Sequence, residues 1–223
     1  MRAAAVVIVV LGLGWVWTHH RQTSLQHRLA AVATQLAGRP VGVRCQGFWA
    51  EMLDIGSRSG EVQFPVGRPP DHMFLVRSVC GRLRHFMDAG SHRNLDCLTT
   101  IDWTTWSIDA DYDGECERHA QDDAEAINTL AHESMHLRGI TSEAEAQCLA
   151  IQADAWTVVR LGGTAAEGDA VANYLLALQP LMPPEYQSSG CRAGGDLDAT
   201  PLTREFPSET SPAIPPLTLP SVS

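Results

Sequence analysis

A helix-dominated α+β domain is the fold class that this sequence predicts, from two main observations. In the C-terminal half, three successive stretches between residues 117 and 178 carry apolar residues at helical spacing, and glycine or hydroxyl-residue signals separate them. Between residues 41 and 70 the chain is rich in glycine and has only short apolar bursts, which are typical of loops with one or two small strands. Hydrophobic residues make up 44% of the 223 residues, enough to form a core.

The N-terminal segment, residues 1–22, has the pattern of an export signal. Arg2 is followed by an unbroken apolar run over 3–17, as in a secretory signal. No small-x-small cleavage site follows the run, and Trp15 and Trp17 suit a membrane interface. The run is short for a membrane span, which needs about 20 residues. We expect an uncleaved single-pass anchor at the cell membrane rather than a cleaved signal of a secreted protein. Both place the chain outside the cytoplasm.

Four further elements are expected before the C-terminal helices. Leucines and valine at helical spacing predict a helical stalk over 23–40, and the segment over 41–70 is expected to hold a strand near 62–64. Apolar spacing predicts a core helix over 74–87, and β-rich composition predicts an edge strand over 101–112.

Start and stop signals delimit the C-terminal helices. The first is expected over 117–138, and Gly139 ends it. Ser142 and Glu145 form a capping-box pattern for the second, which ends near Leu161 before two glycines. A third helix is expected over about 165–178, ending before Pro180.

The domain is expected to span residues 41–191 and to be followed by a Pro/Ser/Thr-rich tail over 192–223. We expect disorder within that tail, over 202–223. The net charge of −10 lacks the clustered positive charge that phosphate binding needs, so nucleic acid is not an expected partner.

Six cysteines, widely spaced and without a Cys-x-x-Cys pair, favour disulfides in an oxidising compartment. The alternative is a set of small buried thiols. Because six cysteines allow fifteen pairings, only one is predicted. We expect Cys148 to pair with Cys191, which would tie the segment after the last helix back to the second helix and close the domain.

The residues with the strongest chemical signal form the run His132-Glu133-Ser134-Met135-His136. Two histidines four apart lie on one face of a helix, one turn apart, and can bind one ion. Glu133 lies beside the first histidine, where its carboxylate can take a proton from a water on the metal. This pattern indicates a Zn²⁺ site in which Glu133 is the catalytic base and His132 and His136 are ligands.

The neighbourhood of this run resembles the zinc peptidases of the gluzincin type. Thr129 and the uncharged residues around the histidines fit the family pattern, whereas Arg138 stands where the family usually has an apolar residue. The following Glu143-Ala144-Glu145-Ala146 resembles the E-x-x-A that supplies the third ligand. The resemblance covers only about residues 124–154 and implies a compact zincin-like helix pair that hydrolyses peptide bonds.

Glu143 and Glu145 are the two candidates for the third metal ligand. We favour Glu143, because Glu145 already has a role as the capping partner of Ser142. Gly139 lets the chain reverse, so that the two helices can pack as a hairpin whose ends meet at the metal. The family often has an Asp four residues after the ligand Glu to orient a ligand histidine. Gln147 stands there, and it can accept a hydrogen bond but adds no charge.

A zinc peptidase also needs a donor to the developing oxyanion, and Tyr112, Tyr174 and Tyr186 are equal candidates. His119 lies more than three turns from His132 and is interpreted as a surface residue. The expected function is hydrolysis of a peptide or protein substrate by zinc-activated water. The rival is a non-catalytic, disulfide-stabilised extracellular binding or structural protein with a degenerate motif.

Overall fold

The computed structural model describes residues 23–46, 59–65, 69–88, 95–103, 118–199 and 206–207. The predicted N-terminal anchor over 1–22 and most of the predicted strand over 101–112 lie outside these residues, as does most of the C-terminal tail. None of the helices within the described ranges is long and apolar enough to cross a membrane.

The strands form a small mixed sheet of three short strands, β1 (Gly42–Cys45), β2 (Gly60–Val62) and β3 (His72–Leu75). Their order is β1-β3-β2, with β3 parallel to β1 and antiparallel to β2. The glycine-rich region therefore contains strands, as its sequence predicts, and β2 lies at one edge of the sheet.

The helix expected over 74–87 begins later, as α3 (Arg77–Met87). The prediction was wrong for its first residues, because Phe74 and Leu75 belong to β3. Met73 and Leu75 are fully buried on one face of that strand, and its backbone pairs with neighbours on both sides. Pairing with strands distant in the sequence overrides the local helical spacing.

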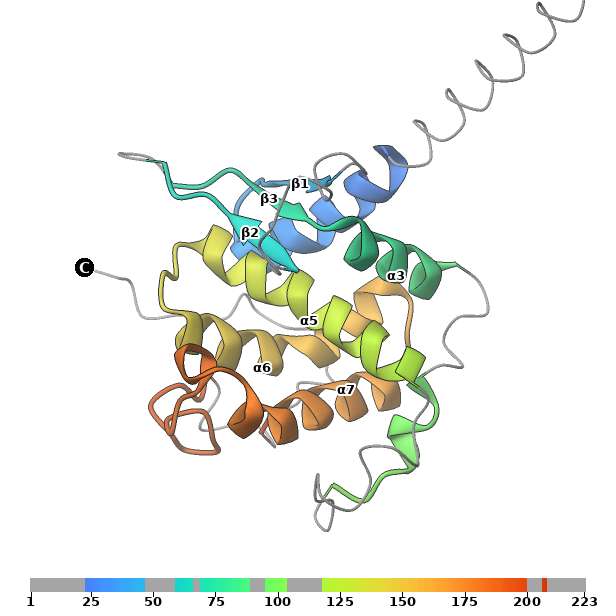
Figure 1. The fold of residues 1–223 in the computed structure, drawn as a ribbon, viewed down its shortest axis with the longest axis vertical. Coiled ribbons are helices and arrows are strands. Elements are labelled where there is room, and N and C mark those ends of the chain that lie inside the picture. Colours follow the sequence, from blue (N-terminus) through green and yellow to red (C-terminus); the bar gives the residue numbers. More distant parts are fainter. Residues whose placement is uncertain are drawn as a thin grey trace, which may run out of the picture.

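The segment expected to be a helical stalk is a helix over 23–37. Leu25, Leu29, Val32 and Leu36 are all buried in the same hydrophobic core as the residues of α3 and the later helices. This helix, drawn in blue in Figure 1, lies beside the sheet and is a packed part of the domain.

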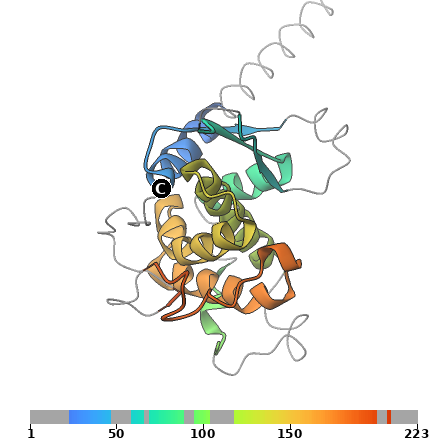
Figure 2. The ribbon, with the colours of Figure 1, turned by 90° about the vertical axis from the view of Figure 1, so that its left-hand side faces the viewer.

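Three helices, α5 (Arg118–Arg138), α6 (Glu143–Leu161) and α7 (Ala165–Leu178), form the rest of the core. α5 packs against the sheet on one side and α6 on the other, and α7 packs against α6 (Figure 1). The same order is visible in the perpendicular view of Figure 2. The predicted bounds of all three helices are confirmed to within a residue or two.

Local signals set the ends of these helices. Gly139 and Gly162, with φ of 110° and 109°, take the left-handed conformation after α5 and α6. The Ser142 hydroxyl accepts a hydrogen bond from the Glu145 backbone N–H at 3.4 Å and caps α6. α7 has a complete capping box between Thr164 and Glu167.

Disulfides tie the domain together. Cys148 is bonded to Cys191, with Cα atoms 5.5 Å apart, so the predicted pairing is confirmed. Cys45 at the end of β1 is bonded to Cys80 in α3. Cys97 is also disulfide-bonded. These bonds indicate an oxidising, extracytoplasmic compartment.

The first part of the segment expected to be a tail is packed against α6. The Gln152 side chain donates to the carbonyl oxygen of Leu197 at 2.8 Å and accepts from the backbone N–H of Ala199 at 2.8 Å. Residues 192–199 therefore continue the domain beyond the disulfide at Cys191.

Candidate metal centre

Three ligand atoms from α5 and α6 meet at one point. His132 Nε2 lies 3.0 Å from His136 Nε2, and Glu143 Oε2 lies 3.0 Å from the first and 3.2 Å from the second. The two imidazoles are buried, with 8% and 7% of their side chains exposed, and Glu143 is 40% exposed. The predicted histidine pair and the favoured third ligand are thus brought together.

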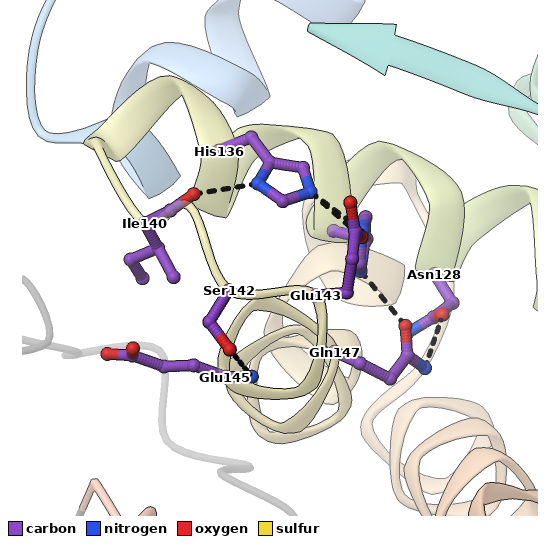
Figure 3. A network of polar contacts seen from close by, with 8 residues as sticks. Asn128, His136, Ile140, Ser142, Glu143, Glu145 and Gln147 are labelled. Carbon is purple, nitrogen blue, oxygen red and sulfur yellow. Dashed lines mark hydrogen bonds and ion pairs between the residues drawn. The ribbon is translucent and has the colours of Figure 1, made fainter. Parts of the chain in front are cut away.

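The local fold explains why these residues converge. The histidines are one turn apart on the face of α5 that looks toward α6. After α5 the chain reverses within four residues, and the backbone N–H of Gly139 donates to the His136 carbonyl at 2.9 Å. Ser142 then caps α6, so that Glu143 is its first residue and projects toward α5 (Figure 3).

The chemistry of the donor set fits a cation. His132 Nδ1 contacts Gln147 Oε1 at 3.0 Å, and His136 Nδ1 contacts the Ile140 carbonyl at 2.7 Å. Both partners are acceptors, so in the neutral imidazoles each Nδ1 carries the proton and each Nε2 presents a lone pair. Two such nitrogens and a carboxylate oxygen facing one another repel unless a positive charge lies among them.

The spacing is compatible with one small tetrahedral ion, such as zinc. Ligand atoms about 2.0–2.1 Å from a tetrahedral ion lie about 3.3–3.4 Å from one another. The three separations here, 3.0, 3.0 and 3.2 Å, are close to that edge length. A His-His-Glu set also leaves the fourth position of a tetrahedron open, as in catalytic zinc sites.

Burial keeps His132 in the neutral form that binds metal. Loss of solvent, and secondarily repulsion from His136, lowers the pKa of His132 from 6.5 to about 4 in spite of the nearby Glu143. At neutral pH its Nε2 is therefore available to a metal without first losing a proton.

Glu145, the alternative ligand, does not take part. Figure 3 shows its side chain pointing away from His136, while Glu143 points toward it. Its backbone N–H is the partner of the Ser142 cap.

Gln147 fills the orienting position expected for a carboxylate. Besides its contact with His132, its Nε2 donates to Asn128 Oδ1 at 2.9 Å, and Asn128 Nδ2 donates to Asp154 Oδ2 at 2.9 Å. Figure 3 shows Gln147 and Asn128 side by side beneath the ligands. Sequence reasoning identified Gln147 and missed Asn128 and Asp154. Asparagine and aspartate within helices of apolar spacing are the signal that could have revealed them.

The expected base, Glu133, is buried beside the ligands, with 6% of the residue exposed. Strand β2 crosses directly over it: a Cβ atom built on Gly60 would lie 2.7 Å from both Cγ and Oε1 of Glu133. Any other residue here would require the Glu133 side chain or the strand to shift. Gly60 is a site residue that the sequence analysis did not identify, because its role depends on a contact between distant segments.

A cavity of about 1030 Å³ opens onto the ligands and Glu133. Its walls come from β2, α5, the end of α7 and the two short turns that follow α7. The apolar part of the lining includes Phe64, Leu175, Leu178, Leu181, Met182 and Tyr186. The volume is sufficient for several residues of a peptide.

The structure distinguishes the three tyrosines. Tyr186 lines the cavity, with its ring centroid 5.7 Å from that of His132. Tyr174 is buried, 2% exposed, beside Trp103. Tyr112 lies outside the described residues. His119 is exposed beside Arg82, as expected of a surface residue.

Arg138, the departure from the family pattern, has a structural role. Its guanidinium donates to the Leu36 carbonyl at 3.3 Å, at the end of the helix over 23–37. A cation is favourable at a helix C-terminus, where carbonyl groups lack intrahelical partners. Arg138 thus links the end of α5 to the end of the helix over 23–37.

No known protein family, curated protein or solved structure matches this chain significantly. The site is therefore interpreted from its own geometry and chemistry.

Proposed function

We propose that this protein is a zinc-dependent peptidase. The observation that carries the proposal is the convergence of His132 Nε2, His136 Nε2 and Glu143 Oε2 within 3.2 Å of one another. These are three lone-pair donors that require a cation, and they lie beside a buried carboxylate, Glu133, in a cavity open to a substrate.

The residues have separate roles. His132, His136 and Glu143 hold the zinc ion. Bound zinc supplies Lewis acidity, which lowers the pKa of a water to near 7 and polarises a carbonyl. Glu133 accepts the proton of the attacking water and delivers it to the leaving amine. Tyr186 is the donor to the oxyanion that develops on the scissile carbonyl.

The shape of the site supports a peptide or protein substrate. Among the described residues, β2 pairs with a strand on one side only, so its other edge offers backbone groups beside Glu133. An extended peptide can pair with such an edge while its side chains occupy pockets. The cavity wall is partly apolar and includes the exposed Phe64 and Leu181, 46% and 53% exposed, which suit apolar substrate side chains.

The disulfides agree with a site of action outside the cytoplasm. The predicted anchor over 1–22 would then hold the peptidase domain at the outer face of the cell membrane, with the membrane as a partner through that segment alone. Intact mass of the exported protein tests this part: a mature chain that begins near residue 20 would show a secreted protein instead.

Metal content and zinc affinity of the purified domain test the centre. We expect one zinc per chain, and loss of it in His132→Ala, His136→Ala and Glu143→Ala. Glu145→Ala is the matched control, because it removes a carboxylate two residues away that points elsewhere, and it should retain zinc. A wild-type chain without affinity for zinc would overturn the proposal and favour the rival, a non-catalytic extracellular protein.

Hydrolysis of a mixed peptide library, read by mass spectrometry, tests the base. Glu133→Gln should retain zinc and fold but lose cleavage, because it removes the proton acceptor and leaves every ligand in place. Equal cleavage rates for Glu133→Gln and wild type would refute the role of Glu133 as the base.

A further inference from the structure

A buried carboxyl group lies beyond the ligand set, in the middle of α6. Asp154 is 0% exposed, and burial raises the pKa of its carboxyl well above the ordinary value. Its Oδ2 accepts a hydrogen bond from Asn128 Nδ2, while its Oδ1 has no hydrogen-bond partner among the described residues. Burying such a group is costly, and zinc ligation does not explain its presence.

Three hydrogen bonds connect this carboxyl to the metal centre. Asn128 Nδ2 donates to Asp154 Oδ2 at 2.9 Å, and Asn128 Oδ1 accepts from Gln147 Nε2 at 2.9 Å. Gln147 Oε1 contacts His132 Nδ1 at 3.0 Å. The three side chains Asp154, Asn128 and Gln147 are buried, and we call them the amide relay.

The amide relay has a direction. Each carboxamide has a donor end and an acceptor end, so when one group turns over, its neighbour must turn over too. A carboxyl at the far end accepts on Oδ2, whether it is ionised or protonated on Oδ1. Asn128 then presents its oxygen to Gln147, and Gln147 presents its oxygen to His132.

The direction decides which nitrogen of His132 carries the proton. An oxygen facing Nδ1 requires Nδ1–H, which leaves Nε2 with its lone pair aimed at His136 and Glu143. In the reversed relay an NH₂ group would face Nδ1, and the proton would move to Nε2. That tautomer cannot ligate a metal through Nε2.

We propose that Asp154 is a positioning residue that acts through Asn128 and Gln147 to hold His132 in its metal-binding tautomer. The consequence for zinc affinity rests on the proposed function, whereas the effect on the tautomer does not. The carboxyl acts across two amides, from a point on α6 that no ligand contacts.

The test reads the His132 tautomer directly in the metal-free protein, by ¹⁵N NMR at neutral pH, with the signal assigned by its loss in His132→Gln. Wild type should show mainly Nδ1–H, although Glu143 lies 3.0 Å from Nε2 and favours the other tautomer. Asp154→Leu removes the acceptor, and Asp154→Asn keeps the shape but offers either an oxygen or an NH₂ group to Asn128. Both remove the bias, so both should show a mixture of the Nδ1–H and Nε2–H tautomers.

Thr157→Val is the matched control. Thr157 is equally buried on α6, and its hydroxyl donates only to the Ala153 carbonyl of the same helix, at 2.9 Å. Its loss should lower stability without changing the tautomer. A wild-type ratio of the two tautomers in every folded Asp154 variant would overturn the proposal. If Asp154→Leu does not fold, Asp154→Asn decides.

Zinc affinity, measured by competition with a chelator, gives the second readout. Asp154→Leu should weaken zinc binding by about 10–100-fold, as other losses of outer partners do, and Thr157→Val should not. The two proposals fail separately. A wild type that binds no zinc refutes the metal centre and leaves the tautomer result standing, whereas unchanged tautomer and affinity in the Asp154 variants refute only the amide relay.

Discussion

Gly60→Ala is the sharpest test of how β2 and the proposed base fit together. The new Cβ atom would lie 2.7 Å from Cγ and Oε1 of Glu133 and 2.9 Å from Cδ. Carbon atoms in contact normally lie about 3.5–4.0 Å apart, so either the strand or the carboxylate must move by roughly 1 Å. Rotation of the carboxylate group about the Cγ–Cδ bond leaves Cγ in place, so it does not remove the contact between the new Cβ atom and Cγ.

The magnitude follows from that displacement. Overpacking of this kind costs about 1–3 kcal/mol of the free energy of unfolding. A misplacement of about 1 Å in a reacting group lowers the rate by about 10²-fold. Zinc content should stay at the wild-type value, because Glu133 is not a ligand. The assays are chemical denaturation, metal analysis and peptide cleavage on the same preparation.

Gly81→Ala is the control for the loss of a glycine. A Cβ atom on Gly81 would meet nothing within 4 Å, and the residue is exposed on α3. Alanine in that helix should raise stability by up to about 1 kcal/mol and leave cleavage unchanged. Wild-type stability together with wild-type cleavage in Gly60→Ala would refute the close packing of β2 on Glu133.

Three further outcomes are expected. Tyr186→Phe should lower kcat by about 10²–10³-fold at unchanged zinc content, whereas Tyr174→Phe should affect stability and not kcat, and equal kcat values for the two would remove Tyr186 from the mechanism. Replacing Cys148 and Cys191 by serine opens a loop with a sequence separation of 43, and should lower the free energy of unfolding by about 4 kcal/mol on the loop-entropy model, as read by urea denaturation. Burial raises the pKa of the Asp154 carboxyl in the folded state. The stability that this carboxyl contributes is therefore complete below its unfolded-state pKa of about 3.9, and it is lost as pH rises toward the folded-state pKa. Wild type should therefore lose stability relative to Asp154→Asn as pH rises above about 4, and a constant difference in urea midpoints would contradict this.

The C-terminal helices were predictable because local rules set them. Periodic apolar residues, Gly139 and Gly162 as stops, and Ser142 as a cap act within a few residues of one another, and α5 ends and α6 begins and ends where those signals stand. The same locality made the histidine pair predictable, since spacing of four on a helix places His132 and His136 on one face.

Elements that depend on distant partners were less predictable. β3 carries residues with helical spacing, and only its pairing with β1 and β2 makes it a strand. The helix over 23–37 has the apolar spacing of a stalk as well as of a core helix, and its burial against the rest of the domain decides between the two.

By itself the sequence determined the helix pair, the histidine pair on one face of α5 and the place of Glu133 beside it, and it narrowed the third member of the group to Glu143 or Glu145, because each of these depends on short-range spacing. Tertiary structure alone decided the rest. Glu143 was selected when the chain reversed after α5 and aimed it at the histidines. Gly60, Asp154 and Tyr186 came to the site from segments distant from the histidines in the sequence, and contacts across such separations depend on how helices and sheet pack, which no local pattern of residues encodes.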